Sequence, residues 1–391
     1  MRHAGAYAML TFPLIIIGCS KSTISDLQDI TPQSGIKMQI LIDWKQEQEF
    51  PWVCNGGTIG RIDNYVIYAT GFGREVPDEL KNIPGYHDGY HRMLALFHIP
   101  TKEWTLTRPL FPGIARAYGA YSAGDGRSVF ILGGQSYAEP FCFRDAYRLF
   151  QVEGAWKWER LPDMLFDTAE FGCAPADDRL YVMGGANYAK DGLRAGWDSE
   201  YQGVGRHLEA LDLSDAGKGW EQLPELPGTH RSHHAMEAIR RRLYVFGGVA
   251  CRGGDKPEAW NCADNWRYDP DSRQWTRIRD LPFPCGGWSS LAYQDRYVLL
   301  FGGYCGRQVL NPDGATRPRY GCDSEGFSNR VIVYDTETNL FSEATPMPKA
   351  INDTRMVWLD DNTMMNVTGE IPGSKRIPCV FRGRIKSAGA D

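Results

Sequence analysis

One pattern occurs four times along the chain: a strand of β-branched, aromatic and aliphatic residues that ends in two glycines. The copies are Val129–Gly134, Leu180–Gly185, Leu243–Gly248 and Val298–Gly303. After each copy come a second strand with a tight turn and an aromatic residue, as in Tyr268–Trp275 and Tyr334–Phe341, and then a Leu-Pro-like pair. A unit of this size buries its apolar face only by stacking on its neighbours, so the pattern predicts a repeat architecture of short strands.

Two looser copies extend the series. Val66–Gly73 stands before the first glycine pair, and Met365–Glu370 stands after the last, which makes six units in all. The composition agrees, because 43 Gly and 23 Pro in 391 residues favour many strands and turns over helices. A chain of this length is too long for one ordinary core but suits one large array of repeats.

The order of strand, glycine pair, turn, aromatic residue and Leu-Pro resembles the kelch repeat, whose units are the four-stranded blades of a β-propeller. The resemblance implies an all-β, six-bladed kelch β-propeller that spans residues 36–386. The last unit supplies three strands, so we expect Lys37–Trp44 to provide its missing outer strand, with Trp44 in the aromatic position of the repeat. This N-terminal strand would close the ring and leave no exposed sheet edge.

The N-terminus has the pattern of an export signal. An apolar run ends at Gly18 and is followed by Cys19, which resembles the lipobox of bacterial lipoproteins. The resemblance implies a signal peptide over residues 1–18, lipidation at Cys19, a polar tether over 19–35 and a bacterial lipoprotein anchored in the membrane, facing the periplasm or the cell surface. The alternative is a plain secretory signal with an incidental cysteine. Residues 387–391 are interpreted as a short C-terminal tail.

Cysteine spacing gives two disulfide candidates. Cys251 with Cys262, and Cys305 with Cys322, each begin and end one insertion that follows a glycine pair. In an oxidising compartment a disulfide at these positions would hold the ends of a long loop together. The alternative to a disulfide is that the thiols stay reduced and pack as small apolar groups. The sequence leaves the pairing of the other cysteines open. The spacing Cys-x-x-Cys does not occur, so no metal site is predicted.

Candidate ligand-binding residues follow from the propeller geometry, which brings the segments that enter the first strands to one face. The polar residues at these places, together with one residue after a glycine pair, are Arg116, Tyr118, Glu170, Arg231, His233, Arg355 and Asn187. Three arginines near one opening would suit an anionic ligand, because a guanidinium group matches a carboxylate in a bidentate way. The alternative is that these groups satisfy strand ends and internal water.

The last unit departs from the repeat, because Glu370 stands where the second glycine is expected, and Pro372, Gly373 and Arg376 follow. This Gly-Glu, Pro-Gly, Arg signature resembles that of exported bacterial N-acetylneuraminate epimerases, also called sialic acid mutarotases. Met183–Tyr188 resembles a second element of that family. In the enterobacterial members the signature lies in the middle of the chain, whereas here it lies in the last unit. The resemblance implies functional roles for Glu370 and Arg376.

The implied reaction needs few groups. A base takes the proton of the anomeric hydroxyl, an acid protonates the ring oxygen, and a cation holds the carboxylate of the sugar. Glu370 is the candidate base, His233 the candidate acid, and Arg376, Arg116, Arg231 or Arg355 the candidate clamp. The implied isomerase requires no metal and no organic cofactor.

Two other classes of function remain open. The first is a non-catalytic propeller on the cell surface that binds a glycan or an envelope protein. The second is a copper radical oxidase of the galactose oxidase type, but no matching arrangement of copper ligands is visible in the sequence. The expected partners are therefore an acidic sugar, a glycan or an envelope protein, and the membrane through Cys19. Nucleic acid is not expected, because the net charge is −5.

Overall fold

The computed structural model describes residues 40–386, apart from 75–81, 83–85, 108–109, 121–122, 188–203, 253–257, 306–325 and 374. This part of the chain is all-β, and its helical segments are two short 3₁₀ turns, η4 (Val204–Arg206) and η5 (Ala216–Lys218). All strand pairs within the sheets are antiparallel.

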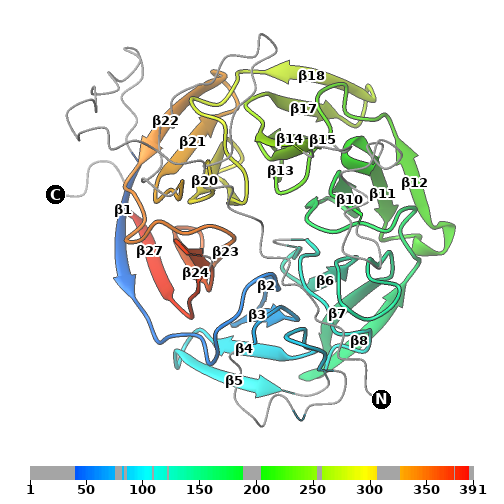
Figure 1. Ribbon diagram of the computed structural model, residues 1–391, viewed down its shortest axis with the longest axis vertical. Coiled ribbons are helices and arrows are strands. Elements are labelled where there is room, and N and C mark those ends of the chain that lie inside the picture. The colour runs from blue at the N-terminus through cyan, green and yellow to red at the C-terminus, as the bar shows by residue number, and fades with distance from the viewer. Residues whose placement is uncertain are drawn as a thin grey trace, which may run out of the picture. The chain divides into compact units, whose positions relative to one another are not determined.

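Six sheets follow one another along the chain and form the blades of a propeller, which confirms the predicted fold (Figure 1). Blades 1 to 3 contain β2 (Thr58–Ile62), β3 (Tyr65–Ala69), β4 (Leu94–His98) and β5 (Glu103–Thr107); β6 (Ser128–Leu132), β7 (Ala146–Val152) and β8 (Ala155–Leu161); and β9 (Gly172–Ala176), β10 (Arg179–Met183), β11 (Leu208–Asp212) and β12 (Trp220–Leu223). Blades 4 and 5 contain β13 (Ala235–Ile239), β14 (Arg242–Phe246), β17 (Asn265–Asp269) and β18 (Gln274–Ile278); and β19 (Ser289–Tyr293), β20 (Tyr297–Phe301), β21 (Val331–Asp335) and β22 (Leu340–Ala344). Blade 6 contains β23 (Arg355–Trp358), β24 (Thr363–Val367), β27 (Val380–Lys386) and β1 (Leu41–Gln46). Two small hairpins, β15 (Val249–Arg252) with β16 (Glu258–Asn261) and β25 (Glu370–Ile371) with β26 (Lys375–Arg376), stand apart from the blades.

The innermost strands bring successive blades into contact. Strand β2 contacts both β6 and β23, β13 contacts both β9 and β19, and β19 contacts β23. Blade 6 therefore meets blade 1, and the series closes on itself (Figure 1). The apolar side chains between neighbouring blades form separate buried clusters, each drawn from two blades, instead of one central core.

The outer strands carry the aromatic residue of the repeat. The indole N–H groups of Trp220 and Trp275 donate to the carbonyls of Pro162 and Pro224, over 2.9 and 2.8 Å. In each case the acceptor lies just after the outer strand of the preceding blade. The tryptophan therefore joins two blades through apolar contact and one hydrogen bond.

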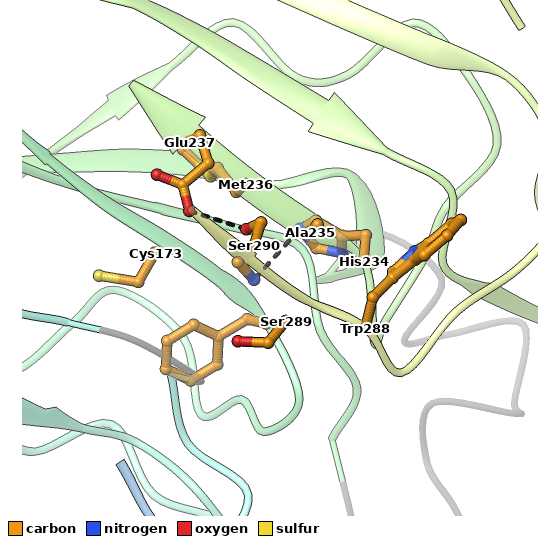
Figure 2. A pocket seen from close by; sticks show the side chains of 10 residues that line it. Cys173, His234, Ala235, Met236, Glu237, Trp288, Ser289 and Ser290 are labelled. Atoms are coloured by element: carbon orange, nitrogen blue, oxygen red, sulfur yellow. Dashed lines mark hydrogen bonds between the residues drawn. The ribbon is translucent and has the colours of Figure 1, made fainter. Parts of the chain in front are cut away.

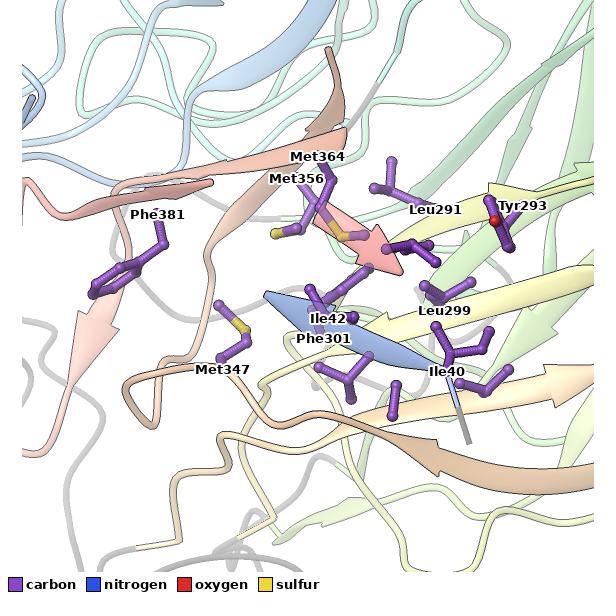
Figure 3. Packing of buried hydrophobic residues seen from close by; sticks show 14 of the residues in the cluster. Ile40, Ile42, Leu291, Tyr293, Leu299, Phe301, Met347, Met356, Met364 and Phe381 are labelled. Carbon is purple, nitrogen blue, oxygen red and sulfur yellow. The ribbon is translucent and has the colours of Figure 1, made fainter. Parts of the chain in front are cut away.

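The N-terminal strand closes the ring as predicted. β1 pairs with β27, and Trp44 lies opposite Gly383, where an added Cβ would come within 2.6 Å of the indole ring. The indole of Trp44 donates to the carbonyl of Thr345 in the way that the other tryptophans bind the preceding blade. Figure 3 shows Ile42 within the cluster between blades 5 and 6, which includes Leu299 and Phe301.

The glycine pairs are explained by the close approach of neighbouring backbones. The second glycine of a pair donates its N–H to a carbonyl of the next blade, as from Gly134 to Thr168 and from Gly185 to Arg231. A Cβ on Gly134 would stand 2.7 Å from the carbonyl oxygen of Ala117, and both glycines of a pair have positive φ. A residue with a side chain would be strained there by its backbone and by its neighbours.

The last unit has its two glycine positions one residue earlier than the sequence predicted. Thr368, with φ of 55°, occupies the first glycine position, because its N–H binds the carbonyl of Cys379 as that of Gly133 binds Asp145. Gly369 is therefore the second glycine. Glu370 does not replace a glycine but follows the pair, where it exchanges two hydrogen bonds of 2.8 Å with Asn352.

Several predictions fall outside the described residues. These are the signal peptide, the lipidation at Cys19, the tether, the C-terminal tail and the thiol of Cys322. Cys305 is disulfide-bonded, and Cys262 is buried. The side chain of Cys251 is not described, so its pairing with Cys262 stays a prediction. Within the described ranges, no helix has the length and apolar character to cross a membrane.

Candidate functional site at the rim of the propeller

Six residues, one from each blade, form a continuous feature that we call the rim: Gly56, Tyr118, Glu170, His233, Gly287 and Asp353. Five of them lie two residues before an innermost strand, and Tyr118 holds the corresponding place in blade 2. Each from the second onward donates its backbone N–H to the carbonyl of the one before it, over 2.6 to 2.9 Å. The rim therefore links the six blades around the axis of the propeller.

All six rim residues have a left-handed backbone, with φ between 55° and 70°. Two are glycines, for which this conformation costs little. The other four carry side chains, and each is strained by roughly 1 to 3 kcal/mol. Strain of this kind is typical of functional sites, and here it presents a phenol, two carboxyl groups and an imidazole at one place in the fold.

Arg376 lies beside one side of the rim. Its Nε donates to Oδ1 of Asn55 over 2.7 Å, and its Nη2 lies 3.5 Å from the hydroxyl of Tyr118, which also donates to Asn55 over 2.9 Å. The amide of Asn55 donates in turn to Asp353 over 3.3 Å. Blades 1, 2 and 6 therefore hold this guanidinium group in one orientation.

Aromatic rings surround the same arginine. Its guanidinium carbon lies 4.6 Å from the centre of the Phe72 ring. Phe72 packs on Tyr90, and the exposed Tyr137 stands edge-on to both rings, at 6.3 and 5.1 Å. Aromatic faces with a few fixed polar groups are what a ligand site of mixed polarity requires.

Glu370 and Arg376 face each other across the β25–β26 hairpin. Burial lowers the pKa of Arg376, but Tyr118 and the charges of Glu370 and Asp353 outweigh burial, so that the pKa is raised overall. The group therefore stays a cation at every physiological pH.

The far side of the rim carries a second polar group. His233 Nε2 lies 3.2 Å from Oε2 of Glu170, and His233 Nδ1 lies 2.8 Å from the hydroxyl of Ser232. The side chain of His233 is 15% exposed and that of Glu170 is 5% exposed, so the imidazole lies nearer to solvent than the carboxylate.

The buried hydroxyl of Tyr90 is subject to charges from both sides of the rim. The pKa of Tyr90 is raised well above its usual value, first by burial and then by Tyr118, Tyr137 and Glu170, while Arg376 opposes the shift. The charges of Glu170 and Arg376 therefore both act on the hydroxyl of Tyr90.

The other three predicted arginines are held in internal contacts. Arg116 makes a bidentate ion pair with Asp145 between the rings of Phe111 and Phe143. Arg231 pairs with Asp264 at 2.6 Å and also donates to the carbonyl of Gly247. Their side chains are 2% and 0% exposed, which leaves no room for a sugar carboxylate.

Arg355 is also fully buried, and it lies between blade 6 and blade 1. Its Nε donates to the carbonyl of Gly57 over 2.5 Å, and its Nη1 binds Asp353. It thus joins blade 6 to blade 1 directly beneath the rim. The candidate Asn187 donates to the carbonyl of Asp167 over 3.0 Å, within blade 3, and none of the contacts described joins it to the rim.

A small cavity lies next to the rim, between the innermost strands of blades 3, 4 and 5 (Figure 2). Its volume of about 20 Å³ suits one water molecule. Glu237 and Ser290 are hydrogen-bonded beside it over 2.8 Å, and the ring of His234 accepts the N–H of Gly172 over 3.1 Å. This space is too small for a sugar, so the cavity itself is not the candidate ligand site.

Sequence reasoning missed Asp353 and the aromatic residues Phe72, Tyr90 and Tyr137. Asp353 could have been found by alignment of the repeats, because it precedes an innermost strand by the same two residues as Gly56, Glu170, His233 and Gly287. The aromatic group could not, since its members come from separate loops. Among the described residues, no group of three or more metal-ligating side chains occurs.

Comparison with known proteins supports the resemblance. The sequence model of the N-acetylneuraminate epimerase family matches residues 197–311. N-acetylneuraminate epimerase of Yersinia enterocolitica is 24% identical over 243 residues, which cover 58% of each chain. The Haemophilus influenzae protein of the same name is 24% identical over 211 residues, covering 49% of this chain and 56% of its own.

A solved structure shows the same fold. The structure described as that of YjhT superposes with a TM-score of 0.61 over 85% of this chain and 95% of its own, at 13% identity. In the sequence comparisons, by contrast, the chain spans about half the length of the curated relatives that it matches. It is a six-bladed propeller that resembles the N-acetylneuraminate epimerases.

Proposed function

We propose that this propeller interconverts the anomers of N-acetylneuraminate or of a similar acidic sugar at its rim. The observation that carries the proposal is the placement of Arg376. Asn55 and Tyr118 hold its guanidinium group over an aromatic face, and Glu370 lies opposite it in the hairpin. A planar guanidinium group in a fixed orientation suits a sugar carboxylate. The named relatives supply the class of sugar.

The reaction would proceed by opening and closing of the sugar ring. Arg376 binds the carboxylate, and Glu370 takes the proton of the anomeric hydroxyl. His233 gives a proton to the ring oxygen as the bond between that oxygen and the anomeric carbon breaks. Rotation about the adjacent carbon–carbon bond turns the keto group over, and both protons return when the ring closes on the other face.

The proposal assigns no ligand contact to Arg116, Arg231 or Arg355, because their guanidinium groups are buried in contacts between or within blades. Their role is to hold the segments that carry the rim. Export as a lipoprotein anchored at Cys19 remains part of the proposal, and it would place the enzyme where free sugars enter a bacterial cell envelope.

The first test measures the exchange of α and β N-acetylneuraminate by proton NMR after release of the pure α anomer. Residues 20–391 should accelerate the exchange over buffer, and a Glu370→Gln variant should lose about 100-fold or more of that acceleration. Glu103→Gln, at an exposed position of β5, is the matched control and should keep the wild-type rate.

Three results would contradict the proposal. If the wild-type protein leaves the exchange at the buffer rate while the sugar still binds, the propeller is a binding protein. If Glu370→Gln retains the full rate, the base is another group. Absence of both exchange and binding would exclude N-acetylneuraminate as the ligand and direct the search to other glycans and envelope proteins.

A further inference from the structure

His233 lies between two polar side chains, those of Glu170 and Ser232. Both ring nitrogens are engaged, Nε2 with Glu170 at 3.2 Å and Nδ1 with Ser232 at 2.8 Å. A histidine that transfers protons needs one nitrogen held by an orienting group and the other directed to the reacting atoms. The two partners of His233 are chemically different, so their roles can be assigned.

Glu170 has the properties of the orienting group. A carboxylate accepts hydrogen bonds and donates none, so the atom that it faces, Nε2, must carry a proton. Its side chain is more deeply buried than the imidazole. The main chain adds a second link, because the carbonyl of Glu170 accepts the N–H of His233 over 2.7 Å. Side chain and backbone thus tie the two residues together.

Ser232 has the properties of a group that passes a proton to and from His233. Its hydroxyl both donates and accepts, so it can pass a proton in either direction at Nδ1. It belongs to the same rim segment, where its N–H and carbonyl exchange hydrogen bonds with Val249. The order of hydroxyl, imidazole and buried carboxylate therefore gives each group a distinct place in a proton path.

We infer that Glu170 is a positioning residue that fixes His233 with its proton on Nε2, so that Nδ1 and the hydroxyl of Ser232 transfer the proton at the rim. The inference rests on the proposed function for its substrate. When the sugar ring opens, the proton on Nδ1 of the imidazolium passes to Ser232, whose own proton passes to the ring oxygen. His233 is then neutral with its remaining proton on Nε2, and ring closure reverses both transfers.

The tautomer can be tested on the free protein, without any sugar. With ¹⁵N-labelled histidine at pH 8.5, long-range proton–nitrogen spectra report which ring nitrogen of His233 carries the proton. Wild-type protein should show a single Nε2–H form, and Glu170→Gln should show a mixture, because an amide both donates and accepts. An unchanged tautomer in Glu170→Gln would overturn the inference.

The use of this path is tested by anomer exchange. Glu170→Gln and Ser232→Ala should each lower kcat at least about tenfold while KM stays within about twofold, and Glu170→Asp should recover part of the loss. A residue with a merely structural role would lower thermal stability and leave kcat of the folded fraction unchanged, and that result would overturn the inference.

The two failures are distinguishable. If wild-type protein does not accelerate exchange, the proposed function fails, and the tautomer measurement alone decides whether Glu170 positions His233. If wild-type protein accelerates exchange and Glu170→Gln does so equally, the proposed function stands and the inference fails.

Discussion

Single residues show most directly where this chain departs from an ideal propeller. At the rim the backbone favours glycine, yet Tyr118, Glu170, His233 and Asp353 occupy four of the six positions. The hydrogen bonds between consecutive rim residues and the buried arginines beside them hold these residues in place. Strain that is supported in this way is typical of functional sites.

A buried carboxyl group gives a separate prediction at this scale. Glu209 in β11 is fully buried, and burial raises its pKa from the usual 4.5 to about 7, although the N–H of Leu165 opposes the shift. The folded protein therefore binds this proton more tightly than the unfolded chain. Its stability falls as the pH rises from about 4.5 to 7, by roughly 1.4 kcal/mol per pH unit for this group.

Glu209→Gln should remove that dependence. The variant should gain stability relative to wild type as the pH rises, by about 2 to 3 kcal/mol between pH 4.5 and 7.5, as measured by urea unfolding at several pH values. Exposed Glu103→Gln is the control, and its difference from wild type should stay flat. A difference that shrinks with rising pH for Glu209→Gln would contradict the prediction.

At the scale of strands and turns, the sequence predicted the order of elements because the repeat requires it. Glycine pairs stand where the neighbouring backbone leaves no room for Cβ, and the outer aromatic residues stand where they bridge two blades. The two looser units keep only the second glycine, since Thr70 and Thr368 take the first glycine position at positive φ. This assignment comes from the hydrogen-bond pattern, which the residue letters do not show.

The closing strand β1 tests whether the ring depends on its N-terminus. Ile42 is 4% exposed within the cluster between blades 5 and 6, while its neighbour Leu41 is 46% exposed. Ile42→Ala should cost about 2 to 4 kcal/mol in urea unfolding, and Leu41→Ala about 0.5 kcal/mol or less. Equal losses for the two variants would show that β1 does not pack as described.

For the molecule as a whole, the candidate site was harder to predict than the fold. Charge and position suggested Arg116, Arg231 and Arg355 as a clamp, but these residues turned out to be buried between carbonyls and carboxylates. Whether an arginine faces a ligand or an internal aspartate depends on partners from another strand or blade. Glu370 and Arg376 were identifiable only through a resemblance, because their hairpin departs from the repeat.

Ring closure itself creates the proposed site, and Asn55 shows how. It is fully buried and joins Tyr118 of blade 2, Asp353 of blade 6 and Arg376 of the hairpin, although 321 positions separate it from Arg376. Asn265 is equally buried, but it binds Gly247 and Arg279 near its own blade. The two amides are matched in burial and differ in what they connect.

Replacement of either asparagine by alanine should cost about 1 to 3 kcal/mol, because buried polar partners lose their hydrogen bonds. Only Asn55→Ala should lose the response to the ligand. N-acetylneuraminate at 100 times its Kd should stabilise wild type and Asn265→Ala by about 2.7 kcal/mol, seen as a rise in Tm, and should leave Asn55→Ala unchanged. If Asn55→Ala keeps the full rise, the sugar binds elsewhere, and if Asn265→Ala also loses it, the effect reflects general loosening of the ring. The expected pattern requires that a contact between the two ends of the repeat series holds Arg376 in its binding orientation.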